Sequence, residues 1–184
     1  MIYPIVAYGD PVLKKEAKDV DLPADDLRQL IDDMFETMYA AQGVGLAAPQ
    51  IGKSLRLFVI DSREMYDEGE EKGIKAAFIN PIIEEESGKE WAMEEGCLSI
   101  PGIKEDIARL SNLTITYTNE EGKRSTATFD DMDARVIQHE YDHIEGILFT
   151  DLLSAFKRRL LKGKLNDISK GRATHSYRMK FPKR

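Results

Sequence analysis

Two histidines separated by three residues, with a glutamate directly after the first, are the residues of this sequence best suited to metal chemistry. They are His139 and His143, and the glutamate is Glu140. Residues four apart lie on the same face of a helix, so both imidazoles can bind one ion. Glu140 then lies where a general base would take a proton from a metal-activated water. These five residues are better explained by a metal site than by two histidines that fall four apart in a buried helix by chance.

A single helix over residues 130–146 is predicted to hold this pattern. Asp130, Asp131 and Asp133 suit a helix N-terminus, where the helix dipole favours negative charge, and Gly146 suits the C-terminal cap. Apolar residues recur at helical spacing, which indicates a buried helix. They are Met132, Val136, Ile137 and Ile144.

The third ligand must come from elsewhere, because a catalytic metal site usually has three protein ligands and one open position. The chain has no glutamate after Glu145, and Phe149 stands where one protease class places a third histidine. Cys97 and His175 remain. A lone cysteine is often a small buried hydrophobe, but Cys97 follows a glycine in a turn-rich segment, and a thiolate with two imidazoles suits a divalent metal. We therefore favour Cys97 over His175, which lies in a basic tail.

Three segments, in this order, resemble the motifs of peptide deformylase. They read GVGLAAPQ over 43–50, EGCLS over 95–99 and QHEYDH over 138–143. Their spacing and the chain length also fit, so the resemblance covers nearly the whole domain. It implies an enzyme that removes the formyl group from the N-terminal formyl-methionine of new proteins and releases formate.

The resemblance also implies roles for individual residues. The metal would be held by Cys97, His139 and His143; it is usually Fe(II) in this family, and Zn, Ni or Co can replace it. Glu140 would be the acid and base, and Gln50 is the glutamine of the first motif. The chemistry of the residues agrees, since a metal-activated water would attack the formyl carbon and Glu140 would pass the proton to the leaving amine.

Further residues are expected to bind the substrate. The Gln50 amide and the Leu98 backbone N–H would stabilise charge on the carbonyl oxygen. Gly43 and Gly45 would let a peptide backbone approach and pair in a strand-like manner. Val44, Leu98 and Val136 are expected to line the methionine pocket.

Two acidic residues within the motifs, Glu95 and Asp142, are assigned roles in support of the site. Glu95 is interpreted as an anchor for the Cys97 loop and not as a catalyst. Asp142 either orders a metal-binding histidine or pairs with a base such as Arg109.

The remaining pattern predicts an α+β fold, with mostly antiparallel β-sheets around the central helix and helices at both ends. An amphipathic helix is expected over 25–41, starting within 21–24. A basic helix is expected from residue 155, in which Phe156, Leu160 and Leu161 share a face.

An exposed loop is expected over 63–73 and a turn over 84–89. Strands are predicted over 55–60, 76–83, 106–110, 113–117 and 124–129, with Pro81 at a strand end or edge.

The length and composition fit one soluble domain. The chain has 184 residues, of which 42% are apolar and 32% are charged. The first ten residues lack the basic segment of a signal peptide, and no apolar run is long enough to span a bilayer. The one cysteine excludes an intrachain disulfide. We therefore expect a cytoplasmic protein that binds neither membrane nor DNA.

The net charge of −7 conceals a basic C-terminus. Residues 157–184 hold eleven lysines and arginines against one acid, Asp167. We expect a catalytic domain over 1–156 and a basic extension over 157–184, a helix followed by an irregular tail. Such an extension suggests contact with a polyanion such as the ribosome, although solvated C-termini are commoner.

Two alternatives remain at this point. A zinc-dependent peptidase would cut internal peptide bonds, but it needs a Glu or His as third ligand. A ribosome-associated binding module with a structural metal would use a closed site, with His175 as a fourth ligand.

Overall fold

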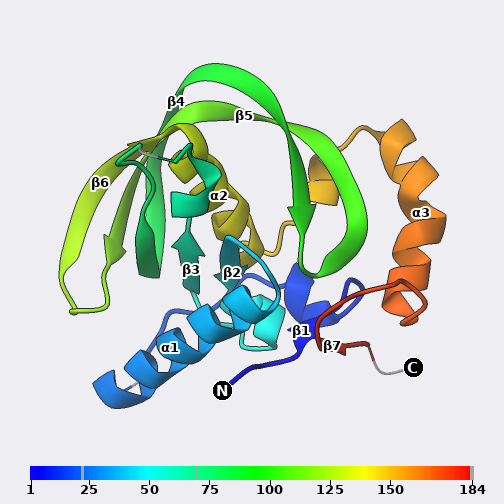
Figure 1. Cartoon of the computed structure of the whole chain (residues 1–184), viewed down its shortest axis with the longest axis horizontal. Coiled ribbons are helices and arrows are strands. Elements are labelled where there is room, and N and C mark those ends of the chain that lie inside the picture. The colour runs from blue at the N-terminus through cyan, green and yellow to red at the C-terminus, as the bar shows by residue number, and fades with distance from the viewer. Residues whose placement is uncertain (22, 69, 183–184) are drawn as a thin grey trace.

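The computed structural model describes residues 1–21, 23–68 and 70–182 of the chain. A five-stranded antiparallel sheet dominates it, with strand order β2-β3-β4-β5-β6 (Figure 1). These strands are β2 (Gly45–Ala47), β3 (Leu57–Asp61), β4 (Lys75–Cys97), β5 (Ile100–Thr118) and β6 (Arg124–Asp130). A second, two-stranded sheet pairs β1 (Ile5–Val6) with β7 (Met179–Lys180) in parallel.

Within the described residues, three α-helices accompany the sheets, which confirms the predicted α+β class. They are α1 (Ala24–Ala40), α2 (Asp131–Ile144) and α3 (Ala155–Ser169). Short 3₁₀ helices cover Pro11–Lys14, Ala48–Ile51, Arg63–Met65 and Phe149–Leu152. Three predicted segments include residues outside the described part of the chain: residue 22 in the helix start predicted within 21–24, residue 69 in the loop predicted over 63–73, and residues 183–184 in the predicted tail.

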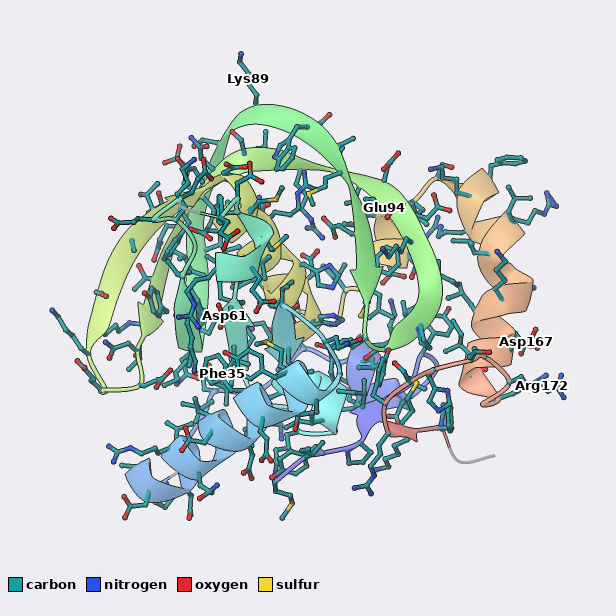
Figure 2. All side chains as sticks on the ribbon, viewed as in Figure 1. Phe35, Asp61, Lys89, Glu94, Asp167 and Arg172 are labelled. Carbon is teal, nitrogen blue, oxygen red and sulfur yellow. The ribbon has the colours of Figure 1, made fainter. Side chains whose placement is uncertain are left out.

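The strands β4 and β5 are longer than the sequence pattern predicted. They form one long hairpin that arches over the rest of the sheet (Figure 1). The turn predicted over 84–89 is wrong, because β4 continues through it. The register shifts between Ser87 and Glu90, and Gly88 has a φ of +86°, so this glycine marks a β-bulge. The nearby Lys89 points outward from the arch (Figure 2).

Pro81 lies inside β4 and not at its end. It follows Ile79, the last β4 residue that pairs with β3, so β4 is an edge of the sheet at Pro81, which agrees with the predicted edge position. The register between β4 and β5 shifts from Ile79 to Ile82, which places Pro81 in a second bulge. A bulge tolerates proline, because a residue there need not donate to the ladder.

The helix α2 lies across the sheet and is largely buried, as its apolar spacing predicted. It contacts β2, β3 and β5, and its apolar face packs into a cluster with Phe58, Phe78 and Leu113. The helix ends before Gly146, whose φ of +74° fits the left-handed cap predicted there. The buried surface fixes the helix, and therefore the histidines that it carries, relative to the sheet.

The helix α1 lies on the lower side of β2 and β3 in Figure 1. Its predicted apolar stripe is buried through Leu30, Met34 and Met38, which pack against β2 and β3 in one cluster. The connection from α1 to β2 contains Gly43. The first motif, residues 43–50, therefore includes the edge strand β2 and follows a helix that is packed in the core.

The C-terminal extension differs from the prediction in two ways. Leu161 is buried, but Phe156 and Leu160 are 69% and 65% exposed, because the buried stripe of α3 runs along Leu161, Leu165 and Ile168. The tail is also not irregular throughout, since β7 pairs with β1. Asp167 and Arg172 lie together where α3 ends and the chain turns back (Figure 2).

No helix within the described residues is long and apolar enough to cross a membrane.

Candidate metal centre

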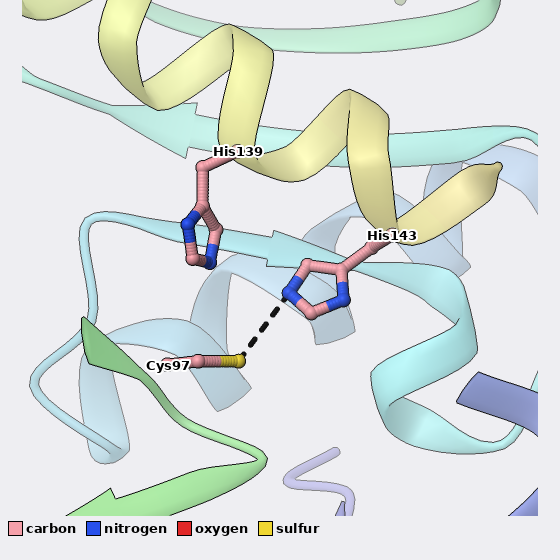
Figure 3. A group of neighbouring side chains, drawn as sticks. All are labelled: Cys97, His139 and His143. Carbon is pink, nitrogen blue, oxygen red and sulfur yellow. Dashed lines mark hydrogen bonds between the residues drawn. The ribbon is translucent and has the colours of Figure 1, made fainter. Parts of the chain in front are cut away.

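Three ligand-type side chains from two elements meet at the centre of the molecule. His139 and His143 project from the same face of α2, and Cys97 stands at the end of β4, facing them (Figure 3). Their donor atoms all lie within 4.8 Å of one another, and Cys97 Sγ is 3.3 Å from His143 Nε2. The spacing on the helix and the end of the β4–β5 hairpin together produce this convergence.

The donor set fits a first-row divalent metal. A tetrahedral site with one thiolate and imidazoles separates sulfur and nitrogen ligands by roughly 3.5 Å, close to the observed separation. His143 is buried, and burial lowers its pKa well below the usual value, which favours the neutral imidazole that binds metal. For His139, burial also lowers the pKa, but hydrogen bonds to Cys97 and Glu95 outweigh burial and raise the pKa, a direction that a bound cation opposes. His175 lies apart, with Nδ1 2.9 Å from the Ala173 carbonyl, and among the described residues it is not part of this group.

Glu140 lies beside the ligands in a buried position. Its side chain is directed at β2, since a Cβ atom on Gly45 would lie 2.4 Å from Glu140 Oε1. Burial raises the pKa of Glu140 to about 7, and the neighbouring carboxylates Glu95 and Asp142 add to this effect. Such a carboxyl can both accept and return a proton near neutral pH. Gly45 is therefore required for space around Glu140, a reason that the sequence did not reveal.

Gln50 places its amide next to the thiol. The amide Nε2 lies 3.4 Å from Cys97 Sγ and 3.3 Å from Ser99 Oγ, and Oε1 accepts a hydrogen bond of 2.9 Å from the Ala47 backbone N–H. These contacts fix the orientation of the amide. Its N–H group therefore points toward the side of the centre formed by the β4–β5 turn.

Leu98 lies in the two-residue turn that joins Cys97 to Ile100. Its side chain packs against the first motif, because a Cβ atom on Gly43 would lie 2.8 Å from Leu98 Cδ1. Gly43 thus allows the turn to approach the connection from α1.

A pocket of about 890 Å³ opens onto this centre. Its size falls within the range of pockets that enclose small ligands. Several residues named from the sequence line it: Gly43, Val44, Gly45, Gln50, Cys97, Leu98, Val136, His139 and Glu140. The three residues predicted for the methionine pocket, Val44, Leu98 and Val136, all line this one pocket.

A model of the polypeptide deformylase family matches residues 2–159. The chain belongs to this family. It is 59% identical to a peptide deformylase of Cytophaga hutchinsonii, with 99% of this chain and 98% of that protein covered. The resemblance found in the three sequence motifs is thereby confirmed.

Solved deformylase structures share the fold. A peptide deformylase from Legionella pneumophila is 41% identical with a TM-score of 0.81, covering 96% of this chain and all of that one. A peptide deformylase from Ehrlichia chaffeensis in complex with actinonin is 35% identical with a TM-score of 0.83, covering 94% and 99%. The chain is therefore a hydrolase of the family that removes the formyl group from nascent peptides.

A buried charge network surrounds the candidate metal centre. Glu95 Oε2 accepts a hydrogen bond of 2.9 Å from His139 Nδ1–H, which leaves the other ring nitrogen for a metal. Arg109 binds both Glu95 oxygens, at 2.7 and 3.0 Å, and Asp142 at 2.8 Å. Burial raises the pKa of Glu95, but the bonds from His139 and Arg109 outweigh it and hold this pKa well below its usual range.

This network connects the two interpretations that the sequence left open for Asp142. The residue pairs with Arg109, and through Arg109 it also joins the group that orients His139. Glu95 orients a histidine as well as lying beside Cys97, which extends its predicted role as an anchor.

Arg135 belongs to the same network but was not predicted from the sequence. It donates hydrogen bonds to Glu95 at 3.0 Å and to the Trp91 carbonyl at 2.7 Å. Its position four residues before His139, on the same helix face, was the available signal.

Replacing Glu95 with glutamine is expected to weaken metal binding about 10- to 100-fold, the usual cost of losing a partner that orients a metal-binding histidine. Competition with a coloured chelator measures this affinity. Glu90→Gln, an exposed position on the same strand, is the matched control. An affinity equal to that of the unmodified protein would show that His139 needs no orientation by Glu95.

Proposed function

We propose that Cys97, His139 and His143 hold one divalent metal ion at which formyl-methionyl peptides are hydrolysed to formate and a free amino terminus. The observation that carries this proposal is the convergence of three metal ligands within 4.8 Å, with a buried glutamate beside them and a pocket in front. Three protein ligands leave a coordination position for water or substrate, the arrangement of catalytic rather than structural sites.

Glu140 carries the proton. A divalent ion bound in this set supplies Lewis-acid chemistry, lowering the pKa of water and polarising a carbonyl. Glu140 accepts the proton of the attacking water and then donates it to the nitrogen of the leaving amine, so that the C–N bond of the formamide breaks. Its pKa of about 7 suits both steps.

Gln50 and Leu98 stabilise the charge that develops on the formyl oxygen. The Gln50 amide is fixed by its bonds to the Ala47 N–H and Ser99 Oγ. The Leu98 backbone N–H is supplied by the turn after Cys97. Each preorganised donor of this kind contributes about 3 kcal/mol to the stability of the transition state.

The peptide binds along β2, which is the edge strand of the sheet. β3 occupies one side of β2, and the other side can pair with an extended peptide. Gly43 and Gly45 carry no side chain that would separate the two backbones. The methionine side chain enters the pocket between Val44, Leu98 and Val136.

We propose Fe(II) as the cellular metal of this chain, with Zn, Ni and Co as substitutes. Thiolate and Fe(II) both oxidise, so activity of protein purified under argon is expected to fall within hours of exposure to air. Formate release is measured before and after exposure, and protein reloaded with nickel is the control. Equal stability of the two forms in air would exclude iron as the working metal.

The basic extension is proposed to contact the ribosome in the cytoplasm, where formylated chains emerge. On α3, Arg158, Arg159 and Lys162 are exposed next to the exposed apolar residues Phe156 and Leu160. Such a surface suits ribosomal RNA or protein. Reversing the charge at these three bases is expected to abolish co-sedimentation with ribosomes at low salt. Co-sedimentation that does not change would refute this contact, and activity on free peptides serves as the control for folding.

The reaction itself is tested with two peptides. Formyl-Met-Ala-Ser should yield formate and Met-Ala-Ser, and unformylated Met-Ala-Ser should remain intact. Cleavage of an internal peptide bond without formate release would instead support a zinc-dependent peptidase.

A further inference from the structure

The C-terminal tail returns from α3 to the middle of the molecule and is fixed there. The chain reverses after α3 at Gly171, whose φ is +70°, and β7 then pairs with β1 (Figure 1). The Ile5 N–H donates to the Arg178 carbonyl and the Ala7 N–H to the Lys180 carbonyl, both at 2.8 Å. These bonds hold the tail in a defined position, although it lies beyond the residues matched by the family model, 2–159.

This anchoring places the residues just before β7 at the catalytic pocket. Thr174, His175, Ser176 and Tyr177 line the same pocket as Cys97, His139 and Glu140. Tyr177 is half-buried and, like Leu98, packs against the core cluster that includes Leu46. The tail therefore forms one wall of the substrate site.

Tyr177 makes one specific contact in this wall. Its hydroxyl donates a hydrogen bond of 2.8 Å to the Leu98 carbonyl. Leu98 lies at the tip of the β4–β5 turn, between the ladder partners Cys97 and Ile100. A carbonyl at the tip of a hairpin lies beyond the last ladder pair, and a partly buried one needs another donor. The Tyr177 hydroxyl supplies that donor.

The turn is thus held from three sides. The Ser99 carbonyl accepts a hydrogen bond of 2.9 Å from the Tyr8 N–H, and Ser99 Oγ lies 3.3 Å from the Gln50 amide. The Leu98 carbonyl is held only by the tail among the contacts of the described residues. A loss of the Tyr177 bond would release the Leu98–Ser99 peptide unit, which adjoins the Cys97–Leu98 unit that carries the Leu98 N–H.

We propose that Tyr177 is a positioning residue for the reaction, because it fixes the turn whose Leu98 N–H faces the formyl oxygen. The segment 174–177 completes the substrate pocket as its outer wall. This inference rests on the proposed role of the Leu98 N–H. It assigns a catalytic purpose to a tail that the family model does not include.

Tyr177→Phe tests the proposal, since it removes the hydroxyl and keeps the ring. We expect kcat for formyl-Met-Ala-Ser to fall about fivefold, the usual effect of one hydrogen bond, while KM changes less than twofold. Tyr117→Phe is the matched control, because its ring packs against Phe78 outside the pocket. Metal content and the thermal midpoint are measured for each protein.

A purely structural role for Tyr177 would lower the thermal midpoint and leave kcat per bound metal unchanged, and that result would overturn the inference. Tyr177→Leu removes the ring as well, and we expect a larger fall in kcat than for Tyr177→Phe. If both variants match the unmodified protein in kcat, the inference fails while the proposed function stands. If the unmodified, metal-loaded protein releases no formate, the proposed function fails and the inference with it.

Discussion

Replacing Glu140 with glutamine is expected to lower kcat/KM for formyl-Met-Ala-Ser about a thousandfold, within the range of general acid–base catalysis. Glutamine keeps the size of the side chain that lies against Gly45 but can neither accept nor return a proton. The metal ligands are unchanged, so the metal content should equal that of the unmodified protein. Formate release and metal analysis on the same preparation check both expectations.

The pH profile provides a second readout for Glu140. The carboxylate accepts the proton, so kcat/KM of the unmodified protein should rise as the pH rises through the Glu140 pKa. Burial sets this pKa to about 7, and a bound cation favours the charged form, so the rise lies at or below pH 7. The Glu140→Gln variant should lack this rise. Glu145→Gln, on the next turn of the chain, is the matched control, and equal loss in both variants would contradict the assignment.

Replacing Cys97 with alanine is expected to abolish metal retention and, with it, all formate release. The substitution removes the only sulfur ligand and leaves two imidazoles, which bind a divalent ion far more weakly than three ligands. Metal content after gel filtration, measured by elemental analysis, should fall from about one ion per chain to almost none.

Cys97→Ser is the companion variant, because it keeps the size of the side chain and replaces a soft ligand with a hard, protonated one. It should also lose most of the metal, and both variants should remain folded because the network around Glu95 and Arg109 is unchanged. Retention of one metal per chain by Cys97→Ala would exclude Cys97 as a ligand.

Local pattern in the sequence was sufficient to predict the central helix and the residues of the centre. The four-residue spacing of His139 and His143 determines their common face. The need for a third ligand favoured Cys97 over His175, and the structure brings Cys97 to the two histidines. The predicted fold class was confirmed, but the length of β4 and β5 was not predicted. Bulges at Pro81 and Gly88 carry the strand past residues that normally end one.

The parts that were missed depend on contacts between distant segments. Arg135 resembles any charged residue on a helix until the fold brings Glu95 to it. Tyr177 acquires its position only because β7 pairs with β1, a pairing of two-residue strands at opposite ends of the chain. Strands of two residues show no periodicity in a sequence, so neither the pairing nor the contact with Leu98 could be predicted.

X-ray absorption at the metal edge of anaerobically purified protein tests the central claim most directly. The account predicts one sulfur at about 2.3 Å and two imidazole nitrogens at about 2.1 Å, with the remaining position taken by a light oxygen ligand. A metal shell without sulfur, or one completed by a third imidazole from His175, would contradict the assignment of Cys97, His139 and His143 as an open catalytic site.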